Sequence, residues 1–146
     1  MQLEEWAKIK FFNPSENWGD TSIIKYPLVK LLDVFRGRIG KPVKILCGTQ
    51  GDHVNGSKHY IGEAVDIVFP WATKEELWDM YILAVKVGFR GIGVYPHWKL
   101  DGQEIGGLHL DIRETDEIVS WLGILDNQGK QVYIPATRAN LRSHGF

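Results

Sequence analysis

Residues 57–66 read Ser57-Lys58-His59-Tyr60-Ile61-Gly62-Glu63-Ala64-Val65-Asp66 and place an imidazole and a carboxylate seven residues apart. The carboxylate of Asp66 interrupts an apolar run that continues to Phe69, which is typical of a buried strand. Burying a carboxylate without a partner is costly, and a metal ion is the most economical partner. We therefore expect His59, from a loop, and Asp66, from a strand, to face one cation.

A second fragment, Gly107-Leu108-His109-Leu110-Asp111-Ile112-Arg113, alternates polar and apolar side chains. In a strand, His109 and Asp111 would share one face. Catalytic zinc sites typically use three protein ligands, and His59, Asp66 and His109 fit that number. Calcium and magnesium prefer all-oxygen shells and fit poorly. Asp111 would either orient a ligand or take a proton from the attacking water.

The spacing by itself leaves an ordinary alternative open, because His-x-Asp is common in strands and the His-x6-Asp pair is weak evidence. The chain has five histidines. His97 and His144 are expected on the surface, and His53 lies in a glycine-rich loop that makes it a poor fixed ligand.

The rest of the chain predicts an α+β fold with a mainly antiparallel sheet and helices packed on one face. Apolar residues at helical spacing follow Pro27 and predict a first helix that ends at Gly37 or Gly40. A capping box at Thr73 and Glu76 starts a second helix, which stops at Gly88. Strands are expected at 43–47, 64–69, 89–95, 108–112 and 132–134, whereas 118–125 is apolar and of open type. We expect one domain over 1–146, with an appended tail at 135–146.

Composition excludes several classes of function. A formal net charge of -1 gives no electrostatic case for nucleic acid, and the sequence shows neither a signal peptide nor a membrane-inserting segment. Cys47 is the single cysteine, which excludes an internal disulfide and a thiolate-rich zinc site and predicts a buried structural thiol. The six Trp and five Tyr fit ordinary packing or a groove for a sugar or peptide polymer.

The motif Ser57-x-His59-x-x-Gly62-x-Ala64-x-Asp66 resembles the signature of the zinc D-Ala-D-Ala carboxypeptidase and L-alanoyl-D-glutamate endopeptidase superfamily, which shares its core fold with the hedgehog signalling domain. The segment 91–96 (Gly-Ile-Gly-Val-Tyr-Pro), the strand carrying His109 and Asp111, and Trp121 are similar to later parts of that family. The resemblance covers about residues 27–122.

The resemblance implies that His59, Asp66 and His109 bind Zn²⁺ and that Ser57 lines the substrate site. Many members carry an acidic general base where this chain has Gly106, so Asp111 and then Glu104 are the candidate replacements. Gln50 stands near the position of a substrate-binding Arg, and an amide cannot make the bidentate bond of a guanidinium. The missing Arg favours an endopeptidase over a carboxypeptidase. Arg113 is a candidate replacement for that substrate-binding Arg.

The expected function is hydrolysis of an amide bond in a peptidoglycan stem peptide by a monomeric zinc peptidase. The alternative is a catalytically degenerate, zinc-stabilised cell-wall-binding or virion structural module. Without a signal peptide, a lysin would be synthesised in the cytoplasm and released by a phage holin or carried on a virion. A bacterial cytoplasmic dipeptidase is a further alternative.

Overall fold

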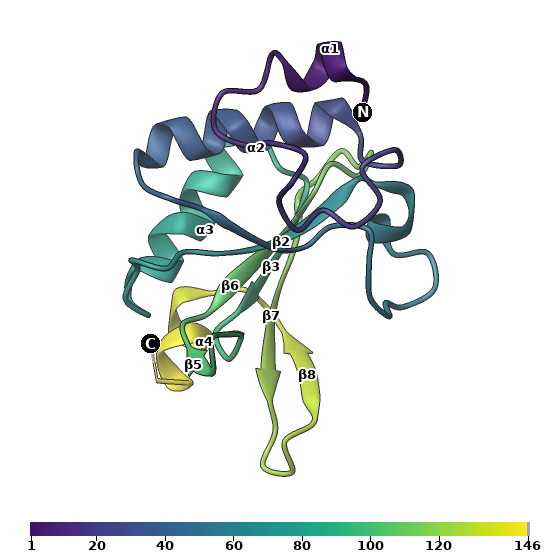
Figure 1. The fold of residues 1–146 in the computed structure, drawn as a ribbon. Coiled ribbons are helices and arrows are strands. Elements are labelled where there is room, and N and C mark those ends of the chain that lie inside the picture. Colours follow the sequence, from purple (N-terminus) through teal and green to yellow (C-terminus); the bar gives the residue numbers. More distant parts are fainter. Residues whose placement is uncertain (146) are drawn as a thin grey trace.

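A mostly antiparallel six-stranded sheet forms the centre of the computed structural model, which describes residues 1–145 (Figure 1). The strand order is β1-β2-β6-β3-β7-β8, and within residues 1–145 the one parallel pair joins β3 to β7. The sheet strands are β1 Lys44–Cys47, β2 Ala64–Val68, β3 Gly91–Tyr95, β6 Gly107–Asp111, β7 Val119–Leu125 and β8 Gln131–Ile134. The predicted α+β class and mainly antiparallel sheet are therefore confirmed.

The helices and a small hairpin complete the fold. The hairpin pairs β4 Lys99–Leu100 with β5 Gln103–Glu104. The helices are α1 Leu3–Trp6, α2 Tyr26–Ile39, the 3₁₀ helix η1 Lys58–Ile61, α3 Glu76–Val87 and α4 Arg138–Ser143. Helices α2 and α3 pack against each other, and α3 also contacts β3 and β6 (Figure 1).

Strand periodicity separates the core from the site. On β6, Leu108 and Leu110 are fully buried in the apolar cluster that also holds Leu32 and Phe35 of α2. His109 alternates with them and faces the opposite side of the sheet, because successive side chains of a strand point to opposite faces. Burying the leucines against the helices therefore fixes the orientation of the histidine.

Glycines make room on the face opposite the helices. A Cβ at Gly91 would lie 2.2 Å from the carboxylate oxygens of Asp111, and one at Gly93 would lie 2.6 Å from the Trp121 ring. At Gly123, a Cβ would lie 2.4 Å from the Tyr95 ring. The glycines of residues 91–96 thus leave flat strand surface on which larger side chains lie.

Several element boundaries refine the expectations. Helix α2 ends at Ile39 and is capped by Gly40, which has a φ of 70°. Thr73 and Glu76 do bond, since the Thr73 N–H donates to the Glu76 carboxylate at 3.2 Å, but α3 begins only at Glu76. In the apolar segment 118–125, residues Val119–Leu125 form strand β7.

Both ends of the described chain pack on the domain. Trp18 of the N-terminal arm is fully buried against Trp6 and Phe12. In the predicted tail, Leu141 of α4 belongs to the core cluster. Phe146, the last residue of the tail, lies outside the described residues. None of the helices within residues 1–145 has the length and hydrophobicity needed to cross a membrane.

Candidate metal centre

Three elements bring the predicted ligands together. His59 lies on η1, whose N-cap Ser57 accepts a hydrogen bond from the His59 N–H at 3.3 Å. Asp66 on β2 and His109 on β6 are paired directly across these two adjacent strands. Gly62 ends η1 with a φ of 72°, and a Cβ there would lie 2.1 Å from the carbonyl oxygen of Ile23. Only glycine suits that turn, which returns the chain from His59 to β2.

The three donor atoms form a nearly equilateral triangle. Nε2 of His59, Nδ1 of His109 and Oδ1 of Asp66 lie 3.1 Å from one another. The two imidazoles are almost fully buried, with residue exposures of 2% and 8%. The three side chains that the sequence predicts as metal ligands therefore meet at one point.

The other nitrogen of each ring is already engaged. Nδ1 of His59 lies 2.6 Å from the carbonyl oxygen of Gly48, which can only accept, so this nitrogen carries the proton. Nε2 of His109 lies 2.9 Å from Oδ2 of Asp111 and donates to that carboxylate. With both rings neutral, two imidazole lone pairs and a carboxylate oxygen converge without a hydrogen between them.

Such an arrangement of acceptors is repulsive unless a cation joins it. A metal ion would satisfy all three atoms, and the buried His59, Asp66 and His109 can hold one. A proton is the competing cation. Burial favours the neutral form of His109, but hydrogen bonds to Asp111 and Asp66 outweigh burial and raise the pKa of the imidazole above its ordinary value.

Asp66 stays ionised in this setting. Burial opposes the charged form, yet the hydrogen bonds that His109 and His59 donate when they carry a second proton hold the pKa of the carboxyl below its usual value. A metal ion would therefore meet a carboxylate that is already deprotonated, and it would take the place of that second proton.

Asp111 lies behind His109 rather than over the triangle. Its carboxylate is fully buried and accepts from the N–H, Nε and Nη2 of Arg113 at 3.1, 2.8 and 2.6 Å, besides His109. Burial would raise the pKa of Asp111, but the bonds from Arg113 and His109 lower it well below its usual range. Of the two predicted roles, the geometry fits orientation of a ligand; the carboxylate does not reach the open side of the triangle.

Glu104 also lies away from the centre. It sits on the β4–β5 hairpin, where its carboxylate is 2.8 Å from Nζ of Lys74 and 3.3 Å from Nδ1 of His97, and it does not line the pocket at the centre. Gly106 has a φ of 74°, and a Cβ there would lie 2.9 Å from Leu77. A larger side chain at that position would be strained in this backbone conformation and would press on Leu77.

A pocket of about 640 Å³ opens at the triangle. Ser57 and Arg113, two of the predicted substrate-binding residues, line it, but Gln50 does not. The Gln50 side chain instead turns inward, accepting from the Gly48 N–H at 2.8 Å and donating to Asn17. It supports the loop that holds His59 and is not placed to contact a substrate.

An aromatic wall that sequence reasoning did not place borders this pocket. Tyr95 and Trp98 stack with centroids 4.3 Å apart, and Nε1 of Trp121 donates to the Tyr95 hydroxyl at 2.8 Å. Tyr133 of β8 also lines the pocket. The six tryptophans hinted at a polymer groove, but no spacing in the sequence indicated which of them would share it.

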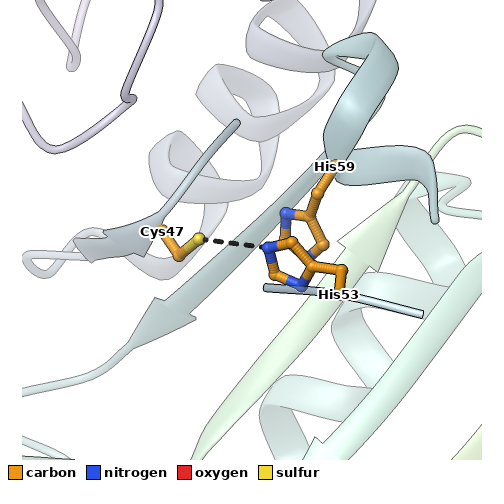
Figure 2. Close-up of side chains that lie close together, drawn as sticks. All are labelled: Cys47, His53 and His59. Carbon is orange, nitrogen blue, oxygen red and sulfur yellow. Dashed lines mark hydrogen bonds between the residues drawn. The ribbon is translucent and has the colours of Figure 1, made fainter. Parts of the chain in front are cut away.

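His53 and Cys47 also lie closer to the centre than expected (Figure 2). The His53 ring stacks on the His59 ring at 4.0 Å and lines the pocket. Cys47 is half-buried at the end of β1, with its Sγ 3.7 Å from Nε2 of His53. The sequence could not predict this contact, because the path of the glycine-rich loop depends on residues distant in sequence.

No protein-family model matches this chain. Comparison with curated proteins likewise finds no match. The family resemblance therefore stays a prediction that rests on the motif residues.

Proposed function

We propose that the protein is a zinc-dependent peptidase that hydrolyses an amide bond in the stem peptide or cross-link of peptidoglycan, as an endopeptidase or a D,D-carboxypeptidase. The observation that carries the proposal is the triangle of two imidazole nitrogens and one carboxylate oxygen with 3.1 Å edges. Tetrahedral zinc with bonds of 2.0–2.1 Å has ligand–ligand distances of about 3.3 Å, close to these edges. When bound, zinc supplies a Lewis acid that polarises a scissile carbonyl and makes water a nucleophile at neutral pH.

Arg113 supports an anionic peptide as substrate. Its Nε and Nη2 bind Asp111, its guanidinium lies 5.4 Å from the Trp121 centroid, and the side chain lines the pocket. Nη1 retains donors that can bind a substrate carboxylate. Lys58, whose Nζ lies 3.8 Å from the Glu63 carboxylate, adds a second cation to the pocket wall. Stem peptides carry several carboxylates, so two cations beside the metal centre suit them.

The aromatic wall supports a substrate that is partly apolar. Tyr95, Trp98 and Trp121 present ring surface beside the metal centre, and their stacking and hydrogen bonds hold them in place. Rings fixed in this way orient a bound chain at little entropic cost. A scissile amide held between this wall and the triangle would be positioned for attack.

Both predicted proton acceptors lie outside the pocket. Hydrolysis needs a group within hydrogen-bond reach of the attacking water. Neither Asp111 nor Glu104 lines the pocket; the carboxylates that do so within residues 1–145 are Asp66 and Asp52. This observation favours a second candidate function, a catalytically inactive, zinc-stabilised cell-wall-binding or virion structural module.

Digestion of purified peptidoglycan separates the two functions. Zinc-loaded protein is incubated with walls of several chemotypes, and new amine termini are identified by mass spectrometry. The peptidase proposal expects cleavage that is lost in His59→Gln and kept in His144→Gln, a matched histidine variant outside the pocket. Sedimentation with the wall without cleavage would support the binding module. Neither cleavage nor sedimentation, with zinc fully loaded, would overturn both.

A further inference from the structure

Cys47 and His53 form a cluster that the first metal centre does not use. Sγ of Cys47 and Nε2 of His53 are 3.7 Å apart, and the carbonyl oxygen of Gln50 lies 2.9 Å from the sulfur and 2.8 Å from the nitrogen (Figure 2 shows the two side chains). Thiolate, imidazole and carbonyl are all metal-binding groups. Three donor atoms of different type therefore meet at one point beside the pocket.

His53 is held in place from outside the glycine-rich loop. Its N–H donates to the Tyr60 hydroxyl at 2.7 Å, and the same hydroxyl donates to the His53 carbonyl at 2.9 Å. The ring also stacks on His59 with an interplanar angle of 10°. Two backbone bonds and a ring contact fix this side chain, so the expectation of a poorly fixed residue does not hold.

The separation of sulfur and nitrogen suits a shared cation. A tetrahedral zinc ion with a Zn–S bond of 2.3 Å and a Zn–N bond of 2.0–2.1 Å places the two ligand atoms about 3.6 Å apart. The observed distance is 3.7 Å. Gly51 faces the same space, where a Cβ would lie 3.5 Å from Nε2 of His53. The Gln50 carbonyl oxygen lies 2.9 and 2.8 Å from the same two atoms, so it would move outward when an ion enters between the side chains.

His59 belongs to the first centre alone. Its Nδ1 donates to Gly48 and its Nε2 faces Asp66 and His109, so neither nitrogen remains for a second ion. The near-parallel stack adds a geometric reason, because imidazole binds metals in the plane of its ring and two stacked planes do not meet. The Cys47–His53 cluster is therefore distinct from the triangle, although it lies next to it.

We propose that Cys47 and His53, with the carbonyl oxygen of Gln50, form a second metal site that takes a thiophilic cation such as Zn²⁺. The inference does not depend on any hydrolytic activity. Thiolate and imidazole together select such ions over calcium and magnesium. The protein would then bind two cations, one at the His59–Asp66–His109 centre and one on the adjacent pocket wall.

Proton balance for this site is simple. In the metal-free protein the thiol and the His53 Nε2–H both point to the Gln50 carbonyl, which can only accept. Burial, and then the charge of Asp66, raise the pKa of the thiol to about 11, so the sulfur carries its proton. Binding releases that proton, while the His53 proton moves to Nδ1, which has no hydrogen-bond partner within residues 1–145. One proton is lost for each ion bound.

Titration of the metal-free protein with Co²⁺ tests the proposal. Only a thiolate ligand gives the near-ultraviolet sulfur-to-cobalt charge-transfer band, and Cys47 is the single cysteine of the chain. We expect two equivalents of Co²⁺ to bind and the thiolate band to saturate with one of them. Cys47→Ser keeps a hydroxyl for Gln50 and should bind one equivalent without the band. His53→Phe keeps the ring stack and should lower the affinity for the Co²⁺ ion that gives the band at least about tenfold.

His59→Gln provides the discriminating control. It removes a ligand of the first centre and should leave the thiolate band in place, with circular dichroism verifying the fold; His109→Gln serves the same purpose if the first variant does not fold. Loss of the band in a folded His59 or His109 variant would mean one shared site and would overturn the proposal. A wild type that binds a single equivalent without the band would overturn it as well.

Discussion

Two hydrogen bonds decide which imidazole nitrogens face the metal centre. The carbonyl of Gly48 takes the Nδ1 proton of His59, and the carboxylate of Asp111 takes the Nε2 proton of His109. Such partners hold the tautomer and raise the basicity of the ligand. Asp111 is thus a positioning residue in this structure, and Arg113 in turn keeps it ionised.

Replacing this carboxylate should weaken the metal rather than stop a chemical step. We expect Asp111→Asn to lower zinc affinity about 10- to 100-fold, because loss of an outer partner of a ligating histidine has that effect. Competition with a chromophoric chelator measures the change. Glu104→Gln, outside the pocket, is the matched control and should bind zinc as the wild type does. A variant of Asp111 that keeps full zinc affinity but loses hydrolysis would restore its role as a base.

The raised pKa of His109 and the lowered pKa of Asp66 make the metal-free protein pH-sensitive. A group whose folded pKa lies above its unfolded value stabilises the protein below the unfolded value, and that stability is lost as the pH rises through the folded pKa. The stabilisation by His109 is therefore complete below its ordinary pKa of 6.5 and is lost as the pH rises through its raised pKa. Asp66 contributes above 3.8, and its contribution is lost as the pH falls. The metal-free protein should be most stable between these two values.

Zinc should reverse the trend on the alkaline side. The metal needs neutral His109, so its affinity should fall as the pH drops below the raised pKa of this imidazole. Thermal unfolding with and without zinc, from pH 5 to 8, measures both curves. We expect the stabilisation by zinc to grow with pH across this range. A zinc effect that is constant throughout would contradict the assignment of His109 as a ligand.

At the scale of elements, the short link from η1 to β2 positions His59 relative to Asp66. Gly62 combines a φ of 72° with a close approach to the Ile23 carbonyl, whereas Gly56 has a similar φ of 76° and open space around it. The two glycines therefore separate the cost of backbone strain from the cost of a steric clash. Strain alone is worth about 1–3 kcal/mol.

Alanine at these two positions should behave differently. We expect Gly56→Ala to lower the free energy of unfolding by about 1 kcal/mol and to leave zinc binding unchanged. Gly62→Ala should cost more than about 3 kcal/mol, since the clash adds to the strain, and should displace His59. Denaturant unfolding and zinc titration measure both effects. Equal losses for the two variants would show that the contact with Ile23 does not constrain the link.

Sequence patterns were informative where burial alternates along a strand. The apolar run around Asp66 and the alternation around His109 sufficed to place both residues on one face. They could not show that the His109 ring would separate Asp111 from the centre, because that depends on a side-chain rotamer. Nor could they place Gln50 or His53, whose loop is fixed by Asn17 and Tyr60 through tertiary contacts.

At the scale of the whole molecule, the N-terminal arm supports the metal centre from behind. The carbonyl of Trp18 accepts from the Thr49 N–H at 2.9 Å, and a Cβ at Gly48 would lie 2.2 Å from the same oxygen. Gly48 thus sits directly on the arm while its own carbonyl holds His59. A residue forty-one positions before the first ligand helps to set that ligand's tautomer.

Removing this support should affect both stability and the metal. Trp18 is fully buried, so Trp18→Ala should cost about 3–5 kcal/mol and, in the protein that remains folded, weaken zinc binding. Trp78→Ala, a partly buried tryptophan on α3, should leave zinc affinity unchanged. Calorimetric unfolding and chelator competition provide the two measurements. Unaltered zinc affinity in folded Trp18→Ala would show that the N-terminal arm does not support the metal centre.

The bridge from Asp66 on β2 to His109 on β6 has a consequence for the unfolding rate of the metal-loaded protein. These ligands are 43 residues apart in the chain and belong to strands flanked by others on both sides. A cation bound to both residues joins the two strands, so separating β2 from β6 also requires the ion to leave at least one of its ligands. The ion can exchange through the pocket that opens at the triangle, but while it is bound it should slow the unfolding of the protein.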